Sequence, residues 1–142
     1  MRAFFRLTLV AFALGSRLLT PTPSAATTAA APTTIHVDFK NTTDRYAWVT
    51  YGDAPTPQGH VYLEYLCIPP HQSVERSYAR EYRASDDPKA FVSATIEGRD
   101  CKGGGNSPFS PARHFISKGR SNDLICTIFE KRIVLHLDPR KL

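Results

Sequence analysis

The chain has 142 residues, of which 42% are hydrophobic and 22% are charged, and its formal net charge is +5. This length is typical of a single domain, and the composition excludes a disordered polyelectrolyte and a collagen-like repeat. The sequence holds no run of about 18 or more apolar residues, so it predicts no ordinary membrane span.

The N-terminal segment has the parts of a secretory signal peptide. Arg2 and Arg6 give it a positive start, the apolar run LTLVAFALG follows, and small residues suited to cleavage end the segment at Ala26. The sequence therefore predicts a signal peptide over 1–26. We expect a secreted protein, either extracellular or periplasmic.

The rest of the chain divides into a tail and one folded domain. Residues 27–34 are rich in Pro, Ala and Thr and are expected to be flexible, and 35–142 form the domain. The signal segment holds three arginines and no acidic residue, so its removal takes away three of the five net positive charges. Because nucleic-acid binding requires a concentrated basic face, we expect no nucleic-acid partner.

Short β-type segments separated by turn residues make up the domain. Residues 34–40 (TIHVDFK) alternate between apolar and polar side chains, as a half-buried strand does. Further strands are expected at 46–51, 60–68, 73–78, 90–98, 114–117, 124–129 and 133–137. This pattern predicts an all-β fold, a single antiparallel β-sandwich of about seven to eight short strands, with a small β-barrel as the alternative.

Two of these segments carry more detailed expectations. Residues 72–83 fit either a strand or a strand followed by a helical turn, and we favour a strand near 73–78. Alternation in 60–68 is expected to place every second residue on the core face, namely Val61, Leu63, Tyr65 and Cys67. Tyr62 would then be exposed beside Glu64.

Three cysteines in a secreted protein imply one disulfide and one further thiol. If the strands run alternately up and down, 60–68 and 90–98 finish at the same end of the sandwich. Cys67 and Cys101 lie at those ends, so we expect them to be bonded, with a Cys101–Cys126 bond as the alternative. Cys126 alternates with apolar neighbours, which favours a buried thiol. We expect either a monomer or a dimer linked through Cys126.

The sequence contains no motif that indicates a cofactor. Cys67 with His71 and Cys101 with His114 could supply a zinc site, but the spacing matches no strong zinc motif and requires unbonded cysteines. The glycines at 103–105 lack the Lys-Ser/Thr of a phosphate-binding loop. We therefore expect neither a metal nor another cofactor.

The histidines give little support for catalysis. His36 and His136 each lie two residues before an aspartate, so a His–Asp contact on one strand face can form. Neither a G-x-S-x-G nor an H-E-x-x-H motif accompanies them. The sequence therefore favours a non-enzymatic protein over a hydrolase.

An N-glycosylation sequon, Asn41-Thr42-Thr43, lies in the turn expected after the first strand. Such a sequon is modified only in a host that glycosylates its secreted proteins. The sequence does not fix that host, so it carries no expectation about a glycan at Asn41.

Aromatic residues give the clearest indication of a binding role. Flat rings with polar tips suit stacking on sugars and contacts with proteins, although the same residues also favour strands for packing reasons. The residues predicted to contact a ligand are Trp48, Tyr51, Tyr62 and Tyr78.

These patterns leave three functional hypotheses. We favour a secreted, non-enzymatic binding or interaction module for a glycan or protein partner. The alternative is a structural or envelope-associated protein in which the third cysteine links chains, and a small secreted hydrolase is the least favoured. A β-sandwich fold does not choose among them, because one fold carries many functions.

Overall fold

The computed structural model describes residues 31–53, 62–97, 100–102 and 109–142. The predicted signal peptide and residues 27–30 of the predicted tail lie outside the described residues. Within these ranges the chain forms eight β-strands and one short 3-10 helix. No helix in the described part of the chain is long and apolar enough to cross a membrane.

Each strand that the sequence predicts has a counterpart, with ends shifted by a few residues. The elements are β1 (Thr33–Asn41), β2 (Tyr46–Asp53), β3 (Leu63–Ile68), β4 (Ser73–Arg80), β5 (Lys89–Glu97), β6 (Ala112–Phe115), β7 (Ser121–Phe129), β8 (Arg132–Leu137) and the 3-10 helix η1 (Pro139–Lys141). The segment that also fitted a helical turn is therefore the strand β4, and no helix follows it.

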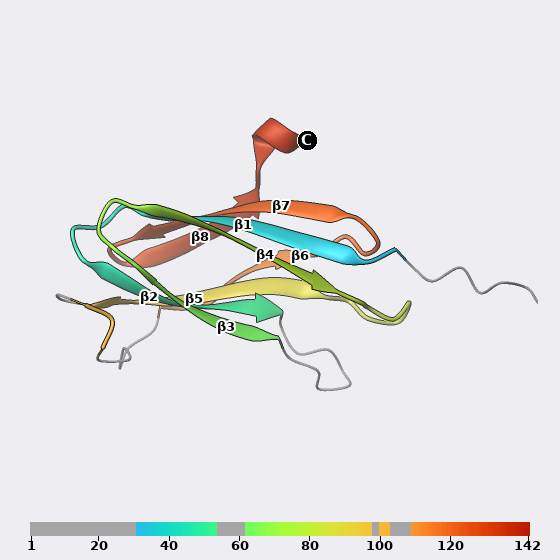
Figure 1. Cartoon of the computed structure of the whole chain (residues 1–142), viewed down its shortest axis with the longest axis horizontal. Helices are drawn as coiled ribbons and strands as arrows, with labels where there is room; N and C mark the ends of the chain where they lie inside the picture. Colours follow the sequence, from blue (N-terminus) through green and yellow to red (C-terminus); the bar gives the residue numbers. More distant parts are fainter. Residues whose placement is uncertain (1–30, 54–61, 98–99, 103–108) are drawn as a thin grey trace, which may run out of the picture.

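The strands form two four-stranded sheets that pack face to face (Figure 1). The β1 sheet has the order β4-β1-β7-β8, and the β2 sheet has the order β3-β2-β5-β6. This arrangement confirms the predicted sandwich rather than the barrel. One pair departs from the antiparallel prediction, because β1 and β7 run parallel. The chain reaches β7 only after crossing to the other sheet, so no hairpin forces these two strands to be antiparallel.

Alternating residues from the two inner faces fill the core. Ile35 and Phe39 of β1, Val49 of β2 and Ile128 of β7 are all 0% exposed. Burying a side chain of this size stabilises the fold by about 1.5–3 kcal/mol. In β5 the inward residues include Val92 and Ala94, each 1% exposed.

β3 corrects one expectation about the core. Leu66 and Ile68 face inward and are 7% and 0% exposed, whereas Leu63 and Tyr65 face outward and are 43% and 60% exposed. Both faces of this strand carry apolar residues, so alternation alone does not select the inner one. Cys67 lies on the outward side with Leu63 and Tyr65, and Val61 lies outside the described residues.

β1 begins at Thr33, inside the segment predicted to be a flexible tail. Thr33 is 2% exposed, and its hydroxyl accepts a hydrogen bond from the Gly119 backbone N–H at 2.8 Å. The Thr34 backbone N–H donates to the Arg120 carbonyl at 3.2 Å. The turn before β7 therefore anchors the start of β1.

The third cysteine lies in the core. Cys126 of β7 is 0% exposed and has no disulfide partner. A buried thiol offers a second chain no exposed sulfur, so the structure gives no support to a dimer linked through Cys126. It likewise gives no support to the chain link on which the structural or envelope-associated hypothesis relied.

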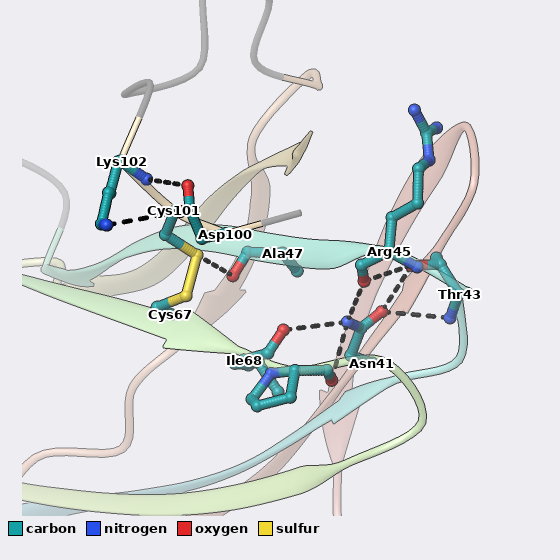
Figure 2. The surroundings of a disulfide bond; sticks show 10 residues. Asn41, Thr43, Arg45, Ala47, Cys67, Ile68, Asp100, Cys101 and Lys102 are labelled. Carbon is teal, nitrogen blue, oxygen red and sulfur yellow. Dashed lines mark hydrogen bonds and ion pairs between the residues drawn. A yellow bond between two sulfur atoms is a disulfide. The ribbon is translucent and has the colours of Figure 1, made fainter. Parts of the chain in front are cut away.

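Asn41 joins the two sheets at one end of the sandwich (Figure 2). The residue is 2% exposed, and its Nδ2 lies within hydrogen-bonding distance of the carbonyl oxygens of Arg45 (2.7 Å), Ile68 (3.1 Å) and Pro69 (3.0 Å). Its Oδ1 accepts from the backbone N–H and the hydroxyl of Thr43, at 3.0 and 2.8 Å. One amide thus connects the end of β1 to the start of β2 and the end of β3.

These bonds also close the glycosylation sequon in the folded protein. The Nδ2 of Asn41, to which a glycan would be attached, is buried and already donates to backbone carbonyls. A sugar there would displace these contacts and require space that the core does not have.

We predict that Asn41→Asp lowers the free energy of unfolding by about 2–4 kcal/mol, because it exchanges a buried donor for an oxygen that faces carbonyl oxygens. Urea denaturation followed by circular dichroism measures the change. Asp44→Ala is the matched control, since that side chain is 90% exposed and its loss should cost less than about 0.5 kcal/mol. An Asn41→Asp protein as stable as the wild type would contradict this role.

We also predict that iodoacetamide does not modify Cys126 in the native protein and modifies it readily after denaturation. Burial raises the pKa of the Cys126 thiol from 9.0 to about 12, so the reactive thiolate is scarce at neutral pH. The thiol ionises at a lower pH in the unfolded chain than in the folded protein. The stability that comes from burying the neutral thiol is therefore complete below pH 9.0, and it declines as the pH rises toward about 12. Mass spectrometry of the alkylated protein gives the answer, and rapid native modification would contradict the prediction.

Candidate binding face

The outward side of the β2 sheet carries an aromatic pair. In β2 the inward residues Ala47 and Val49 are 0% exposed, so the alternation of the strand turns Trp48 outward. Tyr65 of β3 lies diagonally across from Trp48, and the two ring centroids are 5.8 Å apart with 21° between the ring planes. Tyr65 is 60% exposed, so the stacked pair presents ring surface to solvent.

Small hydroxyl side chains lie beside this pair. Thr50 is in register with Tyr65 on one neighbouring strand and with Ser93 on the other, and Trp48 is in register with Thr95. Thr50, Ser93 and Thr95 are all half-buried. The centre of this side therefore offers neutral hydrogen-bonding groups next to aromatic rings.

Further apolar side chains extend the surface. Leu63 is 43% exposed and Phe115 is 62% exposed, and the Nζ of Lys89 lies 4.6 Å from the centroid of the Phe115 ring. We call this outward surface of the β2 sheet the aromatic face. Its members are Tyr46, Trp48, Thr50, Leu63, Tyr65, Phe91, Ser93, Thr95 and Phe115.

The disulfide lies against the aromatic pair. Cys67 is directly opposite Trp48 in the register of β2 and β3, and its Cα is 5.9 Å from that of Cys101. The Cys101 Sγ lies 3.7 Å from the Ala47 carbonyl oxygen (Figure 2). The Cys67–Cys101 disulfide confirms the predicted pairing, and it links the segment that follows β5 to the end of β3.

The outward side of the β1 sheet has a different character. His36 Nδ1 lies 2.6 Å from the Ser77 hydroxyl, and Lys141 Nζ lies 3.0 Å from a carboxylate oxygen of Asp123. Polar and charged side chains pair with one another on this side, as on an ordinary solvated surface. The two outer faces of the sandwich therefore differ in chemistry.

The structure separates the four residues predicted to contact a ligand. Trp48 lies on the aromatic face. Tyr51 and Tyr78 are 5% and 7% exposed, and their ring centroids are 6.2 Å apart, so both rings belong to the core. Tyr62 is half-buried and stacks on Tyr78 with 4.7 Å between centroids, so it is not the exposed ring that alternation suggested.

Tyr51, Tyr78 and Tyr62 form a tyrosine cluster, in which Tyr62 is the member nearest to solvent. Its hydroxyl donates to a carboxylate oxygen of Glu64 at 3.1 Å, and the Arg80 guanidinium carbon lies 5.6 Å from its ring centroid. Arg80 Nε donates to the fully buried Asp53 at 2.6 Å. Burial first, and then the hydrogen bond to Glu64, raise the pKa of Tyr62 to about 12, so its phenol stays neutral near pH 7. The cluster packs one end of the sandwich.

The sequence pattern of β3 does not reveal the residues that flank Trp48, because its alternation also fits Leu63 and Tyr65 in the core. A usable signal was present in the cysteine pairing. Cys67 must project outward if it is to reach Cys101 beyond the end of β5, and this fixes the side on which Tyr65 lies.

Two of the described histidines pair with polar side chains near the surface. The pocket that contains His36 and Ser77 has a volume of about 100 Å³, below the roughly 300–1,000 Å³ typical of small-molecule sites. His71 contacts Asp44 at 2.6 Å, but both side chains are exposed. These pairs therefore give a hydrolase no enclosed site.

The zinc alternative is overturned by the disulfide. Cys67 and Cys101 are bonded to each other, so neither supplies a thiolate ligand. Among the residues that the structure describes, no group of three or more His, Cys, Asp or Glu side chains could hold a metal ion.

Comparison with models of known protein families finds no family that the chain matches. Comparison with curated proteins likewise finds no match.

We predict that the double variant Cys67→Ser, Cys101→Ser unfolds with a free energy lower by about 3–4 kcal/mol, because the unfolded chain loses a cross-link. The bond joins residues separated by 34 positions in the sequence. Urea denaturation without reductant measures the effect, and the wild type with its disulfide reduced should lose a similar amount of stability, because it loses the same cross-link. An unchanged midpoint in the double variant would count against a stabilising disulfide.

Proposed function

We propose that the chain is a secreted, non-enzymatic binding module that contacts a glycan or a protein partner through its aromatic face. The signal-peptide pattern of residues 1–26 supports export. The Cys67–Cys101 disulfide supports an oxidising compartment, in which such bonds persist.

The exposed ring of Tyr65, stacked against Trp48, is the observation that carries this proposal. A solvated sheet face usually carries polar residues, whereas exposed apolar patches mark contact sites on soluble proteins. Tyr and Trp are also the residues most often found at the energetic centre of protein interfaces. Trp48 and Tyr65 are therefore the proposed contact rings, and the buried Tyr51 and Tyr78 are not.

The rings are held rigidly, which favours binding. Trp48 lies on a strand that is paired on both sides, and the disulfide fastens the neighbouring residue of β3. A preorganised ring loses little conformational entropy when a partner arrives. Flexible attachment would weaken the contact by the cost of ordering it.

Two kinds of partner fit this surface. A sugar ring can stack on the aromatic pair while its hydroxyls bond to Thr50 or Ser93. A protein partner would in addition cover Leu63 and Phe115 at the margins. The same substitution tests both, because both rely on Tyr65.

We predict that Tyr65→Ala weakens binding of the partner by about tenfold or more. A glycan array and an immobilised-protein screen of the secreting host's extracellular proteins, each read with labelled wild-type and variant protein, identify the partner and the loss. Trp48 is the chain's one tryptophan, so its fluorescence reports the same titration in solution.

Val134→Ala is the matched control for this experiment. Val134 is 38% exposed and lies on the outward side of the β1 sheet, so its loss should leave affinity unchanged. Tyr65→Ala should also keep the wild-type melting temperature, since Tyr65 is mostly exposed. A partner that binds Tyr65→Ala as tightly as the wild type would overturn the proposed site.

A further inference from the structure

The strand β3 has an open edge. It lies at the end of the β2 sheet and pairs only with β2. The Asp53 backbone N–H donates to the Tyr62 carbonyl at 3.1 Å. In an antiparallel pair, every second residue bonds to the neighbouring strand, so Tyr62, Glu64, Leu66 and Ile68 bond to β2. Leu63, Tyr65 and Cys67 direct their backbone N–H and C=O away from β2, and no described residue bonds to these groups.

The other three edge strands carry more protection against pairing. β4 has charged side chains at Glu75, Arg76 and Arg80, and β6 has only four residues. β8 carries Arg132 and lies against β5 and β6 of the other sheet. Charge, short length and covering are the ways in which soluble proteins block their sheet edges.

β3 lacks most of this protection. Glu64 is the one charged residue in the strand, and it alternates away from the outward side. The residues with free backbone groups include Leu63 and Tyr65, whose side chains are 43% and 60% exposed. The edge therefore combines unpaired hydrogen-bonding groups with apolar side chains, which is the combination that accepts an added strand.

We propose that β3 pairs in antiparallel fashion with β3 of a second copy of this chain, so that two β2 sheets become one continuous sheet. This contact goes beyond the proposed function, because the backbone N–H and C=O groups of the β3 edge form it. The side chains of the two Tyr65 residues lie next to each other at its centre.

The sequence of β3 is complementary to itself in this arrangement. With the twofold axis at Tyr65, each Tyr65 lies opposite its copy, Leu63 lies opposite Cys67, and Glu64 lies opposite Leu66. No two like charges face each other directly, and an aromatic pair meets at the centre, which stabilises antiparallel strands. Each free N–H then meets a carbonyl of the second copy.

The contact area of one short strand pair is small. Stable interfaces usually bury about 1,200–2,000 Å², and a six-residue edge lies at the low end of that scale. The dimer should therefore be weak and should follow protein concentration by mass action.

Sedimentation velocity of the purified protein over about a hundredfold range of concentration tests the proposal. The wild type should sediment faster as concentration rises. Leu63→Pro removes an edge N–H without removing a bond to β2, so it should remain monomeric throughout. Leu63→Ala is the matched control, since it shortens the same side chain but keeps the N–H, and it should still dimerise. A monomeric wild type, or a Leu63→Pro protein that dimerises like the wild type, would overturn the proposal.

A second variant and a second measurement protect the test against a misfolded proline variant. Tyr65→Lys places two like charges opposite each other on the axis and should abolish the dimer while circular dichroism stays unchanged. Amide exchange by NMR should show Leu63 and Tyr65 exchanging rapidly in dilute solution and slowly in concentrated solution. Glu64 and Leu66 should be protected in both, and exchange rates of Leu63 and Tyr65 that ignore concentration would overturn the proposal.

Failure of the edge contact and failure of the proposed function give different results. A partner lost in Tyr65→Ala together with a wild type that stays monomeric supports the binding function and overturns the edge contact. Normal dimerisation together with unchanged partner binding by Tyr65→Ala does the reverse.

Discussion

The alternation of β2 is the constraint on which the β2 sheet and its outer surface depend. Ala47 and Val49 fill the core at 0% exposure, and β2 is the strand that links β3 to β5. A slip of one residue would bring Trp48 into the space of these smaller side chains and expose both of them to water. Trp48 therefore has no alternative to the outward side. The position of Tyr65 beside it follows from the register of β3 on β2.

A disulfide and a set of buried hydrogen bonds hold the same end of β3 (Figure 2). On the outward side, Cys67 is bonded to Cys101, and on the inward side the amide of Asn41 bonds to the carbonyl of the next residue, Ile68. Reduction of the disulfide therefore leaves the hydrogen bonds of Asn41 in place. Toward the opposite end of β3, Leu63 and Tyr65 are 43% and 60% exposed.

The sequence was sufficient for the fold and for the disulfide because both depend on local patterns. Alternation and turn residues located the strands, and the direction of successive strands brought Cys67 and Cys101 together. It was insufficient for the residues of the aromatic face, because their position depends on which face of a strand is buried. In β3 both faces are apolar, so only contact with the rest of the core selects Leu66 and Ile68.

Two tyrosines were also difficult to place from the sequence, because they lie in the core and not on the surface. Tyr51 and Tyr78 resemble surface rings in the sequence, but they lie in the core, where Tyr51 packs against Phe39 with 5.0 Å between ring centroids. A tyrosine carries a polar hydroxyl, so its residue type alone does not indicate that the ring is buried. The parallel contact of β1 with β7 is equally hidden, since it joins segments far apart in the chain without a connecting turn.

β3 offers two surfaces that use different atoms of the same residues. The Tyr65 ring extends outward from the sheet, whereas its backbone N–H and C=O point sideways from the edge. A partner would therefore rely on the Trp48–Tyr65 rings, whereas a second copy would rely on the backbone groups of the edge and on the contact between the two Tyr65 side chains at the axis. Two copies joined along β3 would place two Trp48–Tyr65 pairs on one continuous face. A partner with repeated units, such as a polymer, would then be held at two points, and a modest affinity at each ring pair would become a stronger attachment through the high effective concentration of the second site.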